Sequence, residues 1–231
     1  MRLTFFLALL TCLHPFAAAA QDSSSFSNLS IDSHTRQVQD QAEKVYERTD
    51  YKRAFFIYRF ELAPIGDKYG QYMVGYMYLT GKGVAEDKIA ASAWYRLAAE
   101  RDIKEFIYVS DKLMESLDAD EKARSDQLFL DLRHKYGDLA LLLHAVQSDY
   151  DILRSRTGSR LSAGSSPMTI ISLKSGGAPS TDVDFYGPIE KRMQARLELI
   201  AAYTNIEIID LNHMNMTAIE ATVGEHLAKL D

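Results

Sequence analysis

Apolar positions recur at helical spacing through most of the chain between residues 41 and 157. The clearest run places apolar side chains at i, i+3, i+4, i+7 and i+8, which is one face of an α-helix. Its members are Tyr69, Tyr72, Met73, Tyr76 and Met77. A second run groups small residues around one large aromatic ring: Ala90, Ala91, Trp94, Leu97 and Ala98. Together the two runs predict a pair of closely packed helices, a helical hairpin.

Local signals predict where these two helices end and how closely they approach. Gly81 and Gly83 should terminate the first helix, since glycine adopts the left-handed conformation that a C-cap requires. Asp87 is expected to cap the second helix. Gly75 lies inside the first helix, where glycine costs about 1 kcal/mol relative to alanine. We therefore expect another helix to pack closely against Gly75.

The same hairpin pattern occurs twice. An offset of 37 residues places Ala54–Arg59 over Ala91–Arg96, and it also aligns Asp50 with Asp87. Self-similarity at such a period is the signature of a repeat protein. The sequence thus predicts a strong repeat at 67–102 and a weaker copy at 41–66.

The stronger copy resembles the Sel-one-like repeat, a relative of the tetratricopeptide repeat. The residues that match the family's spacing are Gly81, Gly83, Val84, Asp87, Ala91, Trp94, Ala98 and Ala99, with Tyr95 between them. Gly70 departs from the pattern, since alanine is usual there, and the first copy lacks the glycine turn and the tryptophan. The resemblance implies an α/α superhelical solenoid that serves as a protein interaction scaffold, and it does not imply catalysis.

Further helices are predicted after the repeats, at 103–157. Asp118 and Glu121 have the spacing of a capping box, and a helix that follows them should stop at Gly137. Asp138 is expected to begin the next helix. Because two repeats alone cannot close a solenoid core, these helices should cap it. The predicted helical-repeat domain therefore spans 35–157.

The composition changes after residue 157. Ser, Gly, Thr and Pro dominate 158–187, which predicts a linker, interrupted by a possible strand at 168–173. In the segment 188–231, Pro188 should open a helix, followed by a second strand candidate at 206–211 and a final helix. Two arrangements remain open, a small α+β crossover unit and separate docking of these pieces on the solenoid.

The first twenty residues have the pattern of a secretory signal peptide. Arg2 precedes the apolar run Leu3–Leu13, and Ala18 and Ala20 occupy the small-residue positions before a cut at Gln21. Residues 21–34 then form a flexible polar tether. We expect an exported, periplasmic protein.

Two rival interpretations of this terminus remain open, a lipoprotein modified at Cys12 and a retained membrane anchor. The residues before Cys12 match a lipoprotein site poorly, and an apolar run of eleven residues is short of the roughly 20 that span a bilayer. No later apolar run approaches that length, so no membrane span is expected after cleavage.

Composition narrows the function classes. The chain is 47% hydrophobic and 25% charged, as expected for a folded protein, and its formal charge of −6 argues against nucleic acid as the main partner. Cys12 is the single cysteine and lies in the predicted signal peptide. The mature chain therefore has neither a disulfide nor a cysteine metal site, and it lacks the cysteines of the branch of the Sel-one-like family that has been linked to β-lactam chemistry.

No catalytic, cofactor or metal site is predicted. The histidines that would remain after cleavage lack the i, i+4 spacing of paired metal ligands and the HExxH signature; they are His34, His134, His144, His213 and His226. His213 follows the strand candidate at 206–211, where active sites can lie, but no activated serine pattern accompanies it.

Candidate partner-binding residues come from two features. Tyr78 and Tyr95 lie off the apolar faces of their helices and are predicted to line a groove. Arg156 and Arg160 belong to one compact basic stretch that could bind carboxylates, although a solvated helix end explains it as well. The same solvated position is expected for Arg192 and Arg196.

The sequence as a whole predicts a non-enzymatic, exported scaffold or adaptor that binds a protein or peptide partner in the bacterial cell envelope. It needs neither cofactor nor metal, and it does not bind nucleic acid. The alternative is an envelope hydrolase or a ligand-binding module, carried by the C-terminal segment with His213 at its centre.

Overall fold

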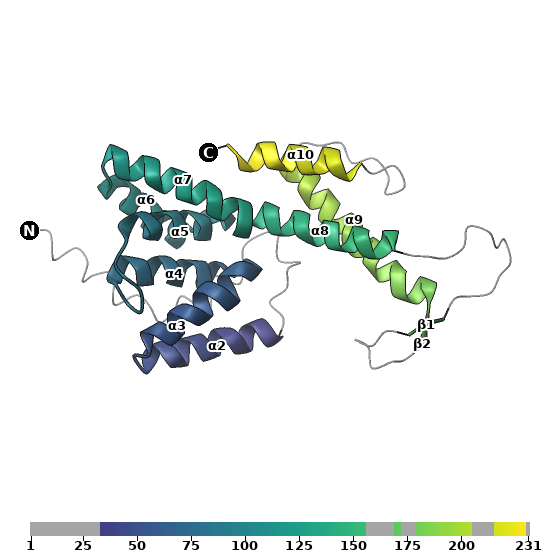
Figure 1. Ribbon diagram of the computed structural model, residues 1–231, viewed down its shortest axis with the longest axis horizontal. Coiled ribbons are helices and arrows are strands. Elements are labelled where there is room, and N and C mark those ends of the chain that lie inside the picture. Colours follow the sequence, from purple (N-terminus) through teal and green to yellow (C-terminus); the bar gives the residue numbers. More distant parts are fainter. Residues whose placement is uncertain (1–32, 156–168, 172–178, 205–214, 230–231) are drawn as a thin grey trace, which may run out of the picture. The chain divides into compact units, whose positions relative to one another are not determined.

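The computed structural model describes residues 33–155, 169–171, 179–204 and 215–229, and the protein is mostly helical (Figure 1). Two compact units are present, the first ending at Asp138 and the second beginning at Leu139. The predicted signal peptide, the strand candidate at 206–211, Arg156, Arg160 and His213 lie outside the described residues. No helix of the described part is long and apolar enough to cross a membrane.

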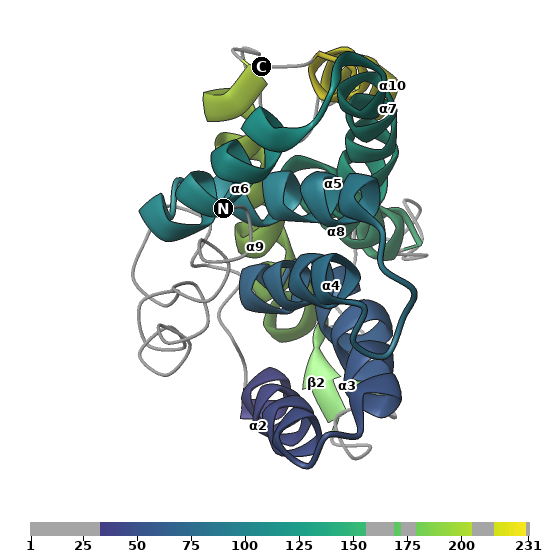
Figure 2. The same cartoon turned by 90° about the vertical axis from the view of Figure 1, so that its left-hand side faces the viewer.

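The first unit is built from helices that follow one another in chain order. Their bounds are α2 (Ser33–Glu47), α3 (Tyr51–Ile57), a π-helix (Tyr58–Leu62), a 3-10 turn (Ala63–Ile65), α4 (Lys68–Thr80), α5 (Lys88–Ala98), a 3-10 turn (Ala99–Arg101), α6 (Lys104–Ser116) and α7 (Ala119–Tyr136). Figures 1 and 2 both show α4 between α3 and α5. The predicted tether ends earlier than expected, because residues 33 and 34 already belong to α2.

The predicted hairpin of α4 and α5 is confirmed together with its ends. The side chain of Asp67 accepts a hydrogen bond from the backbone N–H of Gly70 at the start of α4. Gly81 ends α4 in the left-handed conformation, with φ of 65°. Asp87 caps α5 by accepting hydrogen bonds from the N–H groups of Ile89 and Ala90. These short polar side chains satisfy amides that the first helical turn leaves unpaired.

The glycines of α4 mark the closest helix contacts. A Cβ atom on Gly75 would lie 2.9 Å from Cδ1 of Tyr95 and 3.2 Å from the carbonyl oxygen of Ala91, which confirms the expected approach of α5. At Gly70 a Cβ would lie 2.7 Å from Cβ of Leu62. Any residue with a Cβ atom at this position would therefore force Leu62 to move.

The sequence predicts one buried face for α4, but the helix is buried on every side from Lys68 to Met77. The π-helix lies against one side of α4 and α5 against another. The core that surrounds it is rich in aromatic contacts: the ring of Tyr72 stacks on Phe106 at 4.9 Å and lies tilted against Tyr95 at 5.1 Å. α4 is thus the central helix of the first unit.

The helices that follow α5 confirm the predicted capping signals. The side chain of Asp118 accepts from the N–H of Glu121, and the carboxylate of Glu121 accepts from the N–H of Asp118, which is a complete capping box. α7 then ends at Tyr136, with Gly137 as its C-cap. Since α7 packs along α5, it covers the hairpin of α4 and α5 on that side.

The second unit contains α8 (Asp138–Arg154), β1 (Thr169–Ile171), β2 (Pro179–Thr181), α9 (Asp182–Thr204) and α10 (Met216–Leu227). β1 falls within the strand candidate at 168–173, and its antiparallel partner β2 lies inside the predicted linker 158–187. The chain divides at Asp138 rather than at residue 157, because nearly all of α8 groups with the segments that follow it.

The expectation that Pro188 opens a helix is wrong. α9 begins six residues earlier, at Asp182, and Pro188 lies inside it. Proline has no N–H to donate to the carbonyl of residue 184, so one backbone hydrogen bond is missing there. A helix can tolerate this near its start, where few bonds precede the proline.

Arg192 and Arg196 are not simply solvated, as the sequence suggested. Both guanidinium groups bind the carboxylate of Asp149 on α8, whose side chain is only 3% exposed. Arg192 donates from Nε to Oδ2 over 3.1 Å, and Arg196 also donates to the carbonyl of Ala145. A buried carboxylate requires such partners, which the helical pattern of α9 alone could not reveal.

Candidate protein-interaction surface

The two tyrosines predicted to line a groove differ in burial. Tyr95 is fully buried, so its predicted role in a groove is wrong. α5 contacts α4 on one side and both α6 and α7 on others, and the position off the first apolar face is therefore also covered. Tyr78 is half-buried, and its ring meets that of Phe55 edge-on at 5.3 Å.

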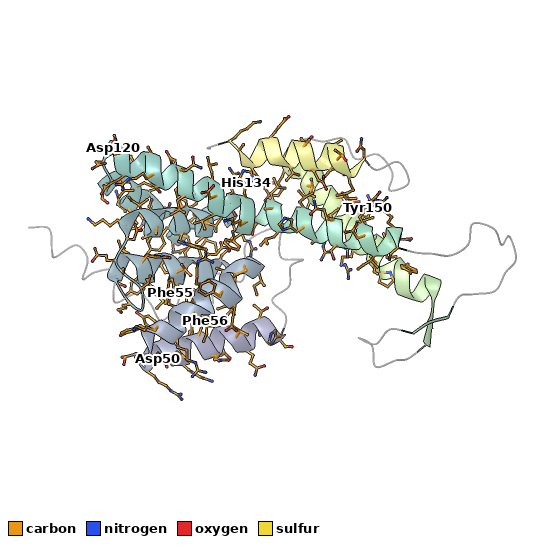
Figure 3. All side chains as sticks on the ribbon, in the orientation of Figure 1. Asp50, Phe55, Phe56, Asp120, His134 and Tyr150 are labelled. Carbon is orange, nitrogen blue, oxygen red and sulfur yellow. The ribbon has the colours of Figure 1, made fainter. Side chains whose placement is uncertain are left out.

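Two phenylalanines of the first unit are instead exposed side by side. Phe56 on α3 and Phe60 on the π-helix are each 56% exposed, and their ring centroids lie 5.2 Å apart. We call them the aromatic pair. Figure 3 labels Phe56 next to Phe55, the neighbour that packs on Tyr78. Exposed aromatic clusters of this kind mark interaction sites more often than single exposed apolar residues do.

Arg59 connects the aromatic pair to the core. Its guanidinium lies 5.2 Å from the centre of the Phe60 ring, 4.7 Å from Trp94 and 5.2 Å from Tyr136. It also donates from Nη1 to the hydroxyl of Tyr136 over 3.4 Å. Trp94 is only 2% exposed, so one side chain links surface rings to buried ones. These cation–π contacts restrain the side chains of Arg59 and Phe60.

A second cation, Lys82, has a structural role in the turn between α4 and α5. Its ammonium lies 5.0–5.2 Å from the ring centres of Tyr46, Tyr51 and Tyr76, and it donates to the hydroxyls of Tyr46 and Tyr76 over 2.6 and 3.3 Å. Burial raises the pKa of Tyr46 to about 12, although the hydrogen bond from Lys82 acts in the opposite direction. Tyr46 therefore stays neutral at physiological pH. Through its contacts with Tyr46 on α2 and Tyr51 on α3, Lys82 holds the turn against these two helices.

A buried ionic cluster lies at the end of the first unit. Lys68 Nζ lies 2.8 Å from Glu100 Oε2 and 3.2 Å from Asp138 Oδ1. Arg101 binds the same Asp138 carboxylate through two N–H groups, at 2.8 and 2.9 Å. Burial by itself raises the pKa of Asp138, but the charges and hydrogen bonds of Lys68 and Arg101 outweigh it and hold that pKa below the ordinary 3.8. The cluster is structural, since each charge has an opposite partner.

The lowered pKa of Asp138 predicts an acid-dependent contribution to stability. A depressed carboxyl pKa stabilises the fold above the ordinary value of 3.8, and this contribution disappears as pH falls through the folded-state pKa. Asp138→Asn should therefore cost about 1.5–3 kcal/mol at pH 7. In urea unfolding followed by circular dichroism, the difference from wild type should shrink below pH 3.8. A difference that stays constant from neutral pH into this range would contradict the assignment.

The acidic residues and histidines of the described part are spread over several helices. Within them, no group of three or more His, Asp or Glu side chains is arranged to hold a metal ion. His34, His134 and His144 are exposed and lie on three separate helices. The second unit does contain an open, mainly polar cavity of about 590 Å³ between α8 and α10, lined among others by Tyr150, Arg154 and Glu220.

Sequence reasoning missed the aromatic pair, although a signal was present. The helical stretch formed by α3 and the π-helix carries more apolar residues than one helical face can bury. Its buried positions are Ala54, Ile57, Tyr58 and Leu62, at i, i+3, i+4 and i+8. Phe56 and Phe60 are four residues apart, so they share a helix face of their own, outside this buried one. The sequence therefore already indicated a second apolar face on this stretch.

A comparison of the chain with protein-family models, curated proteins and solved structures found no match. The resemblance of residues 67–102 to the Sel-one-like repeat therefore remains a prediction from the residues themselves.

Proposed function

We propose that this protein is a non-enzymatic interaction scaffold whose first unit binds a protein or peptide partner at the aromatic pair. The observation that carries the proposal is the exposure of Phe56 and Phe60 together with their attachment to buried Trp94 through Arg59. The Sel-one-like pattern of α4 and α5 supports it, since such repeats present fixed surfaces to other proteins. We further propose that the protein acts in the bacterial envelope after cleavage of residues 1–20.

The physical basis is preorganisation. Binding loses affinity when side chains must be ordered, and the contacts of Arg59 and of the two rings reduce that loss beforehand. Complete burial of a phenylalanine side chain contributes roughly 1.5–3 kcal/mol, and each ring still has more than half of its surface to bury. Two neighbouring rings can therefore provide the centre of a binding hot spot.

The variant Phe56→Ser/Phe60→Ser tests this proposal. We expect it to weaken partner binding by at least about 30-fold, because two anchors that each contribute about 1–2 kcal/mol are lost. The partner is first identified by crosslinking to the wild-type protein in envelope extracts, and its affinity is then measured by calorimetry. Tyr108→Ser, which removes a ring 55% exposed on α6, serves as the matched control and should bind normally. Unchanged affinity of the double variant would overturn the proposal.

A second candidate function is ligand binding in the second unit, and the polar cavity between α8 and α10 is the observation that favours it. The same experiment distinguishes the two. Binding that survives Phe56→Ser/Phe60→Ser and is lost on Tyr150→Ala would place the activity in the cavity.

A further inference from the structure

We propose that the segment recognised by the aromatic pair is acidic, an inference that rests on the proposed function and specifies its partner. The surface concerned consists of Lys52, Arg53, Phe56, Arg59 and Phe60, and we call it the α3 surface. It joins two exposed rings to three cations on adjacent turns of one helical stretch.

Helical spacing places the cations beside the rings. Lys52 and Arg53 precede Phe56 by four and three residues, which puts them on the same side of α3. Both are exposed, whereas Arg59 is half-buried next to Phe60. Nine residues of helix, from Lys52 to Phe60, span about 13 Å, which suits a short peptide segment.

These cations lack carboxylate partners in the described part of the chain. No Asp or Glu oxygen of that part lies within 4.0 Å of the charged groups of Lys52, Arg53 or Arg59. Elsewhere such pairs are formed, as by Arg96 with Asp126 at 2.6 Å. We infer that the partner supplies the carboxylates that pair with the cations of the α3 surface.

Arg59 is the most selective of the three. A guanidinium carries five N–H donors, and among the described residues Arg59 uses one of them on an oxygen, the hydroxyl of Tyr136. The rings around it shield the half-buried guanidinium from part of the solvent, which strengthens a charge-assisted hydrogen bond. A carboxylate arriving beside an apolar side chain would satisfy Arg59 and cover Phe60 at the same time.

An anionic membrane is the other surface that cations with exposed rings can meet, but the observations favour an acidic peptide. Recognition of anionic lipid needs roughly four to eight clustered basic residues, and the α3 surface supplies three. Asp50 and the exposed Glu61 flank it, and the whole chain has a formal charge of −6. A narrow positive strip on an acidic protein suits a segment with a few carboxylates better than an extended anionic plane.

The test uses three fluorescein-labelled twelve-residue peptides with identical leucine and phenylalanine positions and with Glu, Gln or Lys at the others. We expect the Glu peptide to bind the full chain, the Lys peptide to fail, and the Gln peptide to bind at least about tenfold more weakly than the Glu peptide. The variant Lys52→Glu/Arg53→Glu should bind the Glu peptide at least about tenfold more weakly than wild type does. Rising salt should lower the affinity of the wild-type protein for the Glu peptide. The matched control is Lys104→Glu/Arg124→Glu, which makes the same charge change at exposed positions on α6 and α7 and should leave binding unchanged.

Other outcomes overturn the inference in distinguishable ways. Equal binding of the Glu and Gln peptides, with loss on Phe56→Ser/Phe60→Ser, rejects the acidic partner and keeps the proposed function. Binding only to vesicles containing 30% phosphatidylserine, lost on Lys52→Glu/Arg53→Glu, replaces the peptide by a lipid surface. If Phe56→Ser/Phe60→Ser changes the affinity for neither the peptides nor the captured partner, the proposed function fails together with the inference.

Discussion

Replacing Lys68 by methionine should lower the free energy of unfolding of the first unit by about 3–5 kcal/mol. The Lys68 side chain is 2% exposed, and its ammonium donates hydrogen bonds to Glu100, to the carbonyl oxygen of Leu97 over 3.0 Å and to Gln71 Oε1 over 3.1 Å. Methionine preserves the length of the side chain but removes the charge. Glu100 and Asp138 would then remain buried with less positive charge beside them, and such uncompensated burial is strongly destabilising.

The matched control for this variant is Lys112→Met. Lys112 also forms a short ion pair, with Glu115 at 2.6 Å, but both side chains are more than half exposed. Surface pairs contribute little because water screens them, so this variant should unfold at nearly the wild-type urea concentration. If circular dichroism in urea shows equal losses of unfolding free energy for the two variants, the buried cluster contributes no more to stability than the surface pair does.

The second large effect is expected at Gly83, where alanine should cost about 2–4 kcal/mol. The residue has φ of 75°, a conformation that side chains disfavour. A Cβ atom there would also lie 2.2 Å from the carbonyl oxygen of Tyr51 and 2.9 Å from the backbone N of Lys52, so the start of α3 would have to move. Backbone atoms cannot rotate away as the end of a flexible side chain can.

Gly81→Ala separates the two causes of this loss. Gly81 has a similar φ of 65°, but the nearest atom to its added Cβ would be Cβ of Glu86 at 3.7 Å. It should therefore show only the conformational cost of about 1–2 kcal/mol. The displacement of α3 can be followed by the amide chemical shifts of Tyr51 and Lys52 in the Gly83→Ala protein. Equal stability losses and unshifted α3 amides would refute the collision.

The hairpin of α4 and α5 could be predicted from sequence because its determinants are local. Asp87 caps the start of α5, and Gly81 ends α4. The low helix propensity of Gly75 is offset by the close packing of α5. Each of these signals lies within a few residues of the feature it specifies. The same holds for the capping box of Asp118 and Glu121.

Features that depend on how many neighbours surround a helix could not be predicted. A helical wheel identifies the most apolar face, but it does not show that α5 is covered on several sides, and Tyr95 was therefore misplaced. Composition changes at residue 157, whereas contacts divide the chain at Asp138, because the packing partners of α8 follow it in sequence. The bond of Arg196 to Asp149 likewise joins residues 47 positions apart.

The contacts of Trp94 have an optical consequence. It is the single tryptophan of the chain, it lies beneath the guanidinium of Arg59, and its ring stacks on Tyr136 with centroids 5.9 Å apart. A carboxylate that draws Arg59 outward would change the electric field across the indole ring, and the emission of that ring responds to such a field. The protein thus carries an intrinsic fluorescent reporter directly beneath the α3 surface, and occupancy of that surface can be read without attaching a label to either molecule.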